Sequence, residues 1–375
     1  MVSDLPQHDD RLPSYLSGHD IQSLPSSQTL GQPPPQGQAF THCGKIVRKL
    51  CRGHLISDTA RSLLQASWRS ETQTRYGYVI KKWEAYCRQW HIDPIHTPVA
   101  NVLNFLGQRF HEGAGYRSIC ACRSALNTVV SLHEGLELSD HPLMKRFVKG
   151  VFHLRPPLPK YTQVWDVGMV IAYIRSLGCT NDQLSLKDLT MKLTALLSIL
   201  TAQRISSISY LSVSHMFIEE DKVIFTPVQL SKHHRQGRKI LPITIHGYPL
   251  DPRLCVIRTL REYMSRRQDI VADSLVLTHR KPRRPATKSS IARWLKQVLR
   301  LAGVDSSVFT AHSFRSSSTS SAKAAAIPIA TILGKGQWTS ERTWRNHYDL
   351  ELMPMATPED EEDYTEQLLD AYPPQ

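Results

Sequence analysis

Apolar residues recur at helical spacing in the first half of the chain. In the segment 71–90 they fall at i, i+3, i+4, i+7 and i+10, which places them on one face of a helix. These positions are Tyr76, Val79, Ile80, Trp83 and Tyr86. The segments 99–110, 116–133 and 141–157 show a similar period. We therefore expect residues 55–155 to form a small bundle that is helical throughout.

The pattern changes after a proline-rich segment. Pro156, Pro157 and Pro159 exclude a helix from 154–166, which predicts a linker. Beyond it, helices are expected at 167–177, 185–202, 253–268, 288–302 and 312–325, with a last short element at 340–350.

Two segments rich in β-branched residues, 221–229 and 238–246, flank the polar turn 230–237 and predict a β-hairpin. The fold class is therefore expected to be mainly α with a small antiparallel β-sheet. We divide the chain into a basic, disordered lead-in (1–54), a helical block (55–155), a second block (156–350) and an acidic tail (351–375).

The charge of the chain is strongly basic once its two ends are set aside. Lys and Arg total 46 against 33 Asp and Glu, a net charge of +13. Residues 41–349 alone carry 45 bases and 21 acids, a net charge of +24. Such an excess favours a polyanionic partner, and we expect a nucleic acid. The candidate DNA-binding residues are Lys81, Lys82, Lys145, Arg146, Lys160, Arg235, Arg238, Lys239, Arg280, Arg283 and Arg284.

The basic segment 278–290 has two interpretations, a DNA-contacting strip or a nuclear-import signal, and we expect the protein in the nucleus. No apolar stretch looks like a signal peptide or is long enough to span a membrane, so no membrane partner is expected. The seven cysteines are irregularly spaced and favour a reducing compartment. His42, Cys43, Cys51 and His54 suit zinc by type but not by spacing, and we expect no metal site.

The second block also contains residues suited to phosphate chemistry. Arg204 follows an apolar run, where it is either a helix C-cap or a charge that needs a partner. His312 and Arg315 lie three residues apart, on one face of a helix start. Trp338 and Tyr348 follow them. Each feature is weak by itself.

Together and in this order, these residues resemble the tyrosine recombinase (integrase) family. The resemblance spans about 55–350 and rests on the motifs TAQR, LSK, AHSFR and GQWTSERTWRNHY. Its details look similar to recombinases of DIRS-like and Crypton-like mobile elements. It implies a helical core-binding (SAM-like) domain followed by a tyrosine recombinase catalytic domain.

The resemblance also implies roles for six residues. Tyr348 would be the nucleophile, and Arg204 and Arg315 would bind the phosphate. His312 would act as a base or phosphate ligand, and Trp338 as a ring N–H donor. Lys232, in the hairpin turn, would protonate the leaving oxygen, although Lys239 or plain surface charge is the alternative. No cofactor is implied.

The implied function is site-specific DNA recombination by a homotetramer on double-stranded DNA, through a 3′-phosphotyrosyl intermediate. Two alternatives stay open, a recombinase-derived DNA-binding protein without chemistry and a type IB topoisomerase-like enzyme. Many family members carry an acidic residue three positions after the first arginine, where this chain has Ser207. We therefore expect Arg204 to be held less firmly than in those members. The S-x-x-K pair Ser320 and Lys323 matches a serine acyl-enzyme motif, but its partner motifs are lacking and we set it aside.

Overall fold

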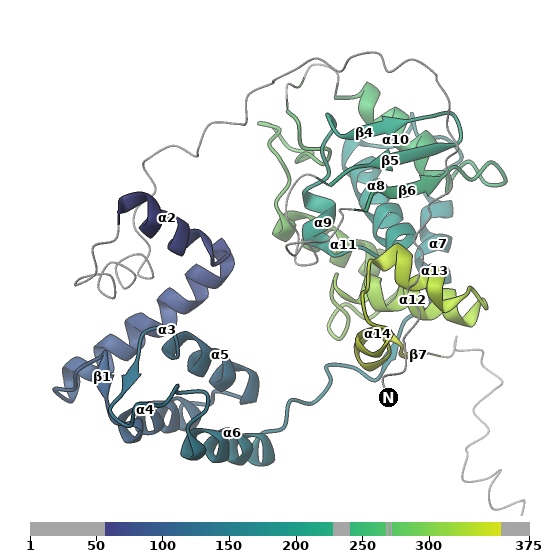
Figure 1. Cartoon of the computed structure of the whole chain (residues 1–375). Coiled ribbons are helices and arrows are strands. Elements are labelled where there is room, and N and C mark those ends of the chain that lie inside the picture. Colours follow the sequence, from purple (N-terminus) through teal and green to yellow (C-terminus); the bar gives the residue numbers. More distant parts are fainter. Residues whose placement is uncertain (1–56, 228–240, 268–269, 271, 354–375) are drawn as a thin grey trace, which may run out of the picture. The chain divides into compact units, whose positions relative to one another are not determined.

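The computed structural model describes residues 57–227, 241–267, 270 and 272–353. The chain divides into two compact units, Met1–Leu158 and Pro159–Gln375 (Figure 1). Each unit has its own hydrophobic core within the described residues. We describe the two units separately.

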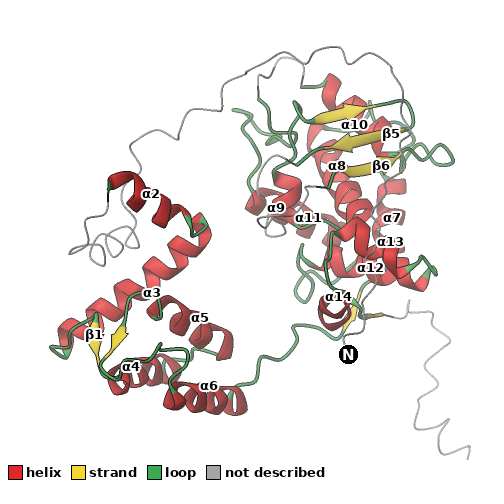
Figure 2. Ribbon diagram, viewed as in Figure 1, coloured by secondary structure: helices red, strands yellow, loops and turns green. Residues whose placement is uncertain are grey.

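The first unit is a helical bundle with one small pair of strands (Figure 2). Its elements are α2 (Asp58–Ala66), α3 (Ser70–Gln89), β1 (His96–Thr97), α4 (Val99–His111), α5 (Tyr116–Leu126), β2 (Ser131–Leu132) and α6 (Pro142–Leu154). Trp83, on the predicted apolar face of α3, is 1% exposed and stacks on Tyr86, with ring centroids 5.8 Å apart.

The expectation that this unit is helical throughout was wrong at two places. β1 and β2 pair in parallel, and α5 ends at Leu126 instead of continuing to 133. Thr97 precedes Pro98, and a residue before proline is driven towards extended backbone. The backbone N–H of Ser131 then donates to the carbonyl of Ile95 at 2.8 Å, which satisfies that extended segment.

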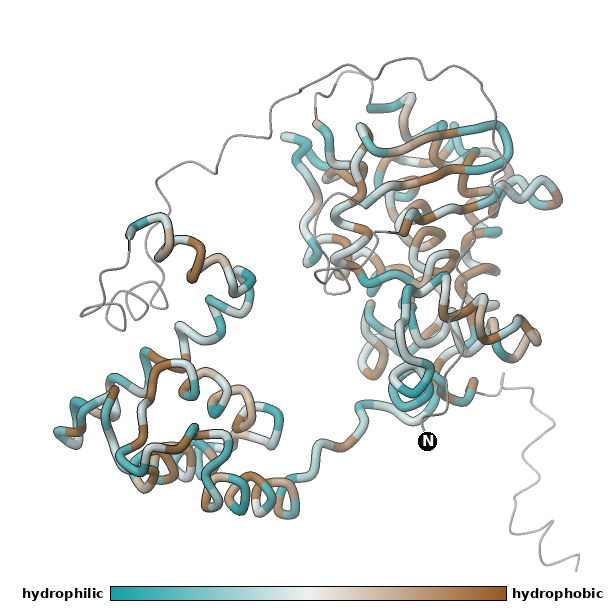
Figure 3. The backbone as a smooth tube through the Cα atoms, viewed as in Figure 1, coloured by the Kyte–Doolittle hydropathy of each residue, from teal (hydrophilic) through white to brown (hydrophobic). Residues whose placement is uncertain are grey.

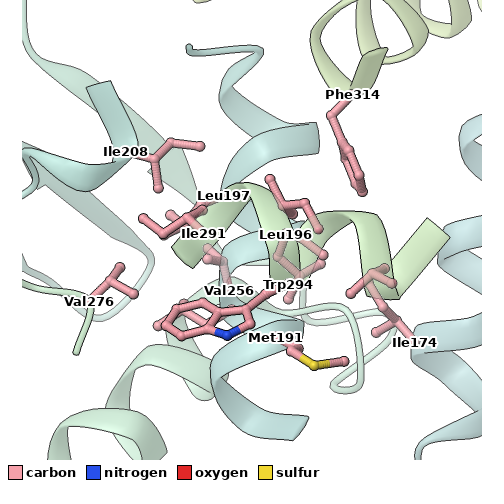
Figure 4. Close-up of a cluster of buried hydrophobic side chains, with 14 of the residues drawn as sticks. Ile174, Met191, Leu196, Leu197, Ile208, Val256, Val276, Ile291, Trp294 and Phe314 are labelled. Carbon is pink, nitrogen blue, oxygen red and sulfur yellow. The ribbon is translucent and has the colours of Figure 1, made fainter. Parts of the chain in front are cut away.

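The second unit packs helices around a buried central helix, α8. The elements are β3 (Gln163–Val164), α7 (Val167–Ser176), α8 (Leu186–Thr201), α9 (Ile205–Ser209), β4 (Met216–Ile218), β5 (Lys222–Phe225), β6 (Ile243–His246), α10 (Val256–Ser265), α11 (Lys288–Leu301), α12 (Ser313–Ala324), α13 (Ile329–Gly336), α14 (Glu341–Tyr348) and β7 (Glu351–Leu352). Met191, Leu196 and Leu197 of α8 lie in the core with side chains from α7, α10, α11 and α12 (Figure 4).

The predicted hairpin strands form part of a three-stranded antiparallel sheet, in the order β4-β5-β6. β5 and β6 pair with Lys222 opposite His246 and Phe225 opposite Ile243. Val223 and Phe225 are buried, so β5 alternates between buried and more exposed positions. Ile243 and Ile245 are the buried positions of β6, and Figure 3 shows hydrophobic stretches along the strands of this sheet. Within the described residues, β5 and β6 cover only part of the predicted segments, and β4 was not expected. The predicted turn lies outside the described residues.

The fold class is confirmed, because the structure is mainly helical with a small antiparallel sheet. Three details of the second unit differ from expectation. α9 and α13 were not predicted. The predicted linker extends too far, since Val164 and Trp165 are almost fully buried. Val164 belongs to β3, which pairs in parallel with β7, and the Trp165 indole N–H donates to Ser313 Oγ at 2.8 Å.

Candidate active site

Arg204 lies at a sharp break between two helices. Ala202 adopts left-handed backbone with φ 47° and ends α8, and Arg204 is the N-cap residue of α9. The interpretation of Arg204 as a helix C-cap was therefore wrong, since Ala202 occupies that position. Because the chain turns at this break, Arg204 does not extend the apolar face of α8, and its side chain is half-buried.

Arg315 is buried in the first turn of α12 and held by two backbone carbonyls. Its side chain is 2% exposed. One terminal nitrogen donates to the carbonyl of Ala202, and the other donates to the carbonyl of Gly336 at 2.9 Å. The planar guanidinium thus joins the α8–α9 break to the end of α13. Burial, together with the nearby Arg204 charge, lowers the pKa of Arg315 to about 9, so it remains charged at neutral pH.

Two aromatic rings pack against this guanidinium. Arg315 Cζ lies 3.6 Å from the ring centroid of Trp338 and 5.2 Å from that of Tyr348. The rings of Trp338 and Tyr348 are themselves 5.0 Å apart, at 65°. This is a cation–π cluster in a mostly desolvated place, where such contacts are strongest.

Gly336 makes the close packing of Trp338 possible. A Cβ at this position would lie 1.6 Å from Cζ3 of the Trp338 ring, so only glycine fits there without a shift. Its carbonyl is the one that accepts from Arg315. The sequence analysis missed Gly336, although its place two residues before Trp338 in GKGQW offered a signal.

Two donors in this cluster have no partner among the described residues. They are the buried Nε of Arg315 and the buried Nε1 of Trp338. A buried N–H without an acceptor costs about 1–3 kcal/mol, so such a group calls for an explanation. An anionic ligand with several acceptor oxygens would satisfy both.

His312 and Tyr348 complete the cluster. His312 is the N-cap residue of α12 and is exposed, and its ring centroid lies 6.0 Å from that of Tyr348. Tyr348 is the last residue of α14 and half-buried. The neighbouring His347 is exposed.

The structure therefore brings Arg315, Trp338, Tyr348 and His312 together, with the charge of Arg204 reaching Arg315. Trp338 is also a core residue, 9% exposed and packed with Ala202, Ile332 and Trp344. The predicted Lys232, Arg235, Arg238 and Lys239 lie outside the described residues, as do the four residues weighed as a zinc site.

The other candidate DNA-binding residues lie at or near the surface of their units. Lys81, Lys145, Arg146, Lys160, Arg280 and Arg284 are exposed, and Lys82 and Arg283 are half-buried. Four of them have local partners. Lys145 lies 3.3 Å from Asp140, Arg283 donates to the carbonyl of Arg266 at 3.1 Å, and Lys82 and Lys160 lie over the rings of Tyr78 and Tyr161. Within the described parts of the chain there is no cluster of three metal-ligating side chains, and no helix is long and apolar enough to cross a membrane.

The site lies within a segment that matches a known protein family. Residues 176–351, which contain the whole cluster, match the model of the phage integrase family. No curated protein matches the sequence.

Solved structures share the fold at low sequence identity. The XerH site-specific recombinase bound to difH substrate, in a pre-cleavage complex, is 13% identical with a TM-score of 0.54, over 82% of this chain and 92% of that chain. The Tn1549 transposon integrase in complex with transposon right end DNA is 12% identical with a TM-score of 0.52, over 88% and 99%. The XerH post-cleavage complex on palindromic difH is 13% identical with a TM-score of 0.51, over 82% and 91%. The chain therefore shares the fold of these recombinases, and its residues 176–351 match the phage integrase (tyrosine recombinase) family.

Proposed function

We propose that the protein is a site-specific DNA recombinase that cuts and rejoins DNA through a 3′-phosphotyrosyl intermediate. The observation that carries this proposal is the cluster itself. A buried arginine and a tryptophan N–H, both with unpartnered donors, lie against the ring of a tyrosine. A phosphodiester supplies the acceptors that these donors lack.

The chemistry would proceed by in-line displacement. The Tyr348 oxygen forms a bond to phosphorus while the bond from phosphorus to the 5′ oxygen breaks. The phenol proton passes to a base, for which His312 is the candidate, and the 5′ oxygen leaves as a hydroxyl after receiving a proton. Lys232 remains our candidate for that acid. Because the phosphotyrosyl ester conserves the bond energy, religation requires no cofactor.

The two arginines would stabilise the charge that develops on the phosphate. Arg315 stays protonated at neutral pH, and its two carbonyl partners fix the plane of its fork before substrate arrives. Losing one such preorganised donor should cost about 3 kcal/mol in the barrier, or about a hundredfold in rate.

The test is covalent trapping on DNA. Binding sites are first selected from a random duplex pool with Tyr348→Phe, which should bind without reacting. The wild-type protein is then incubated with nicked duplexes carrying those sites and run on denaturing gels. We expect a protein–DNA adduct that Tyr348→Phe abolishes and that the exposed-tyrosine control Tyr248→Phe retains.

The other outcomes identify the alternatives. Binding without any adduct on the selected sites would contradict the enzyme and favour a DNA-binding protein. Adducts together with relaxation of plasmids that lack a selected site would favour a type IB topoisomerase-like enzyme.

We further propose that the protein serves a mobile element of the DIRS-like or Crypton-like kind, acts in the nucleus and assembles as a homotetramer on paired sites. The net charge of +24 on residues 41–349 supports DNA binding, and the basic segment 278–290 supports nuclear import. Sedimentation of the protein on a synthetic four-way junction tests the assembly. Four protomers per junction are expected, and a monomer on each arm without association would contradict it.

A further inference from the structure

A group of basic side chains lies at the other end of α8 from Arg204. Lys187 is in the first turn of α8, whereas Arg204 follows its last turn. At 1.5 Å per residue, the 16 residues of α8 separate these ends by about 24 Å. The group is therefore distinct from the active-site cluster.

These side chains surround one cavity of about 580 Å³. It lies between the first turn of α8, the loop Thr278–Arg284 and α11, and no Asp or Glu lines it. The titratable side chains of its wall are Lys187, His279, Arg280, Lys281, Arg284 and Arg293.

The loop that contributes most of these charges is held by its own hydrogen bonds. The backbone N–H of Thr278 donates to the carbonyl of Arg284 at 2.8 Å, and the N–H of Arg284 donates to Thr278 Oγ1 at 3.0 Å. The N–H of Ala286 donates to the carbonyl of Val276 at 2.8 Å. The cations are thus presented on a preorganised frame, which reduces the entropy lost on binding.

The charges of this cavity are not neutralised within the described residues. None of its five Lys and Arg side chains forms an ion pair or a side-chain hydrogen bond there. The carboxylate of the nearby Asp188 acts on His279, but this single negative charge leaves the five cations in excess.

The positive charges around the cavity affect the pKa of His279. Burial, and then the charges of Arg280 and Lys187, lower the pKa of His279. Its Nδ1 is buried and has no partner among the described residues. A ligand with acceptor oxygens would satisfy such a site, and a cation would not.

We propose that this cavity is a second phosphate-binding site, which takes the sugar–phosphate backbone of the DNA at a distance from the scissile phosphate. The arginine forks suit phosphate oxygens bidentately, and the ligand would supply the negative charge that the wall lacks. The choice of DNA as the source of the phosphate rests on the proposed function. The phosphate chemistry rests on the cavity alone.

The experiment compares two exposed arginines of the same helix. Arg293 lines the cavity, and Arg300 lies near the other end of α11 and does not. The affinity of Arg293→Ala and Arg300→Ala for the selected duplex is measured across salt concentrations, both in the Tyr348→Phe background. We expect Arg293→Ala to weaken binding and to lower the salt slope by about 0.9, the value for one lost phosphate contact, with Arg300→Ala unchanged.

A second arm measures binding of inorganic tripolyphosphate by calorimetry. If Arg293→Ala loses tripolyphosphate binding but keeps DNA binding and its salt slope, the cavity binds phosphate, and its ligand is a free polyphosphate instead of DNA. If Arg293→Ala matches Arg300→Ala with both ligands, the site is overturned. Because no adduct is measured, this outcome is independent of whether the protein cuts DNA.

A second inference comes from the S-x-x-K pair of α12. Ser320 Oγ donates to the carbonyl of Tyr348 at 3.1 Å and accepts from the N–H of Leu350 at 3.1 Å. Lys323 Nζ lies 2.8 and 2.9 Å from the two carboxylate oxygens of Asp349. Ser320 thus holds the backbone on both sides of Asp349, and Lys323 holds the Asp349 carboxylate, directly after the tyrosine.

We infer that Ser320 and Lys323 are positioning residues for Tyr348. Tyr348 is the last residue of α14, and Arg315 lies on α12, as do Ser320 and Lys323. The contacts of Ser320 and Lys323 therefore fix the end of α14 relative to Arg315. Loosening them should leave DNA affinity intact and misplace the nucleophile, where a displacement of about 1 Å can cost a hundredfold. This inference rests on the proposed function.

The matched control is Ser317, another buried serine of α12, whose hydroxyl has no partner among the described residues. At saturating DNA we expect Ser320→Ala to slow adduct formation at least tenfold, with the DNA dissociation constant unchanged, while Ser317→Ala reacts as wild type. Lys323→Ala should also slow it, and Lys323→Arg should restore it. Equal rates for Ser320→Ala and Ser317→Ala would overturn the inference, whereas absence of any wild-type adduct would overturn the proposed function instead.

Discussion

At the scale of single residues, Trp338 combines two roles. Its ring covers the Arg315 guanidinium and fills the small core with Ala202, Ile332 and Trp344. Its Nε1 is buried and has no partner among the described residues. Packing explains the position of the ring, but it leaves the N–H without an acceptor, which the phosphate of the proposed reaction would supply.

Replacing the indole by a phenyl ring separates these roles. Trp338→Phe should keep most of the packing and lose the donor to the phosphate, so adduct formation should slow about tenfold or more. Trp344→Phe is the matched control. The Trp344 Nε1 is also buried and has no partner among the described residues, but the ring that lies against Arg315 is that of Trp338. Single-turnover rates on nicked duplexes measure the difference, and equal effects of both variants would contradict a role for the Trp338 N–H.

At the scale of elements, the end of α13 shapes the site. Gly334 and Gly336 both belong to this helix, yet a Cβ at Gly334 would meet nothing within 4 Å, whereas one at Gly336 would collide with Trp338. Packing against Trp338 therefore requires glycine at position 336, whereas position 334 has room for a larger side chain.

We expect Gly334→Ala to leave the protein unchanged or to stabilise it by up to about 1 kcal/mol, since alanine favours helix. Gly336→Ala should lower the melting temperature and slow adduct formation, because the Trp338 ring must move. Thermal unfolding followed by circular dichroism checks both variants. A Gly336→Ala protein as stable and as reactive as wild type would show that the ring has room to shift.

A buried carboxylate links α7 to the segment before α10. Asp251 accepts from Arg253 Nε at 2.9 Å and from Arg175 Nε at 2.8 Å. These bonds, from Arg253 first and then Arg175, hold the pKa of Asp251 well below its usual range.

This link predicts how stability depends on pH. A carboxylate with a depressed folded-state pKa contributes stability above its unfolded pKa of about 4, and loses it as the pH falls below that value. Urea unfolding of the second unit should therefore become easier below about pH 4 in wild type, with a shallower fall in Asp251→Asn. Parallel curves for the two proteins would contradict the link.

At the scale of the whole molecule, each of the two units has its own main hydrophobic core among the described residues. Val102, Leu106 and Leu126 belong to the first, and Leu193, Leu197 and Leu295 to the second. The division falls between Leu158 and Pro159. Each core is large enough to support cooperative folding by itself.

A fragment that begins at Pro159 should therefore fold cooperatively, as judged by circular dichroism and a single unfolding transition. It keeps Arg204, His312, Arg315, Trp338 and Tyr348 and should form the adduct, but with weaker DNA binding, since it loses the basic residues of the first unit. A fragment that is unfolded by itself would contradict independent cores.

Much of this architecture could be predicted from the sequence. Helix periods placed α3, α4, α6, α8, α11 and α12 within a few residues, because an amphipathic face depends on local spacing. The ordered motifs identified five of the residues that the structure brings to one site. The short pairs β1–β2 and β3–β7 were missed, because two-residue strands depend on partners distant in the chain.

The sequence by itself determined the residue types, their order and the charge excess, which together gave the fold class and the candidate chemistry. Only the tertiary structure decided that Arg315 is anchored by the carbonyls of Ala202 and Gly336, and that Ser320 and Lys323 hold the segment after Tyr348. It also decided that the basic loop and two helices enclose one cavity. These are contacts between residues up to 113 positions apart, and no local period encodes them, because they arise only when separate helices pack on a common core.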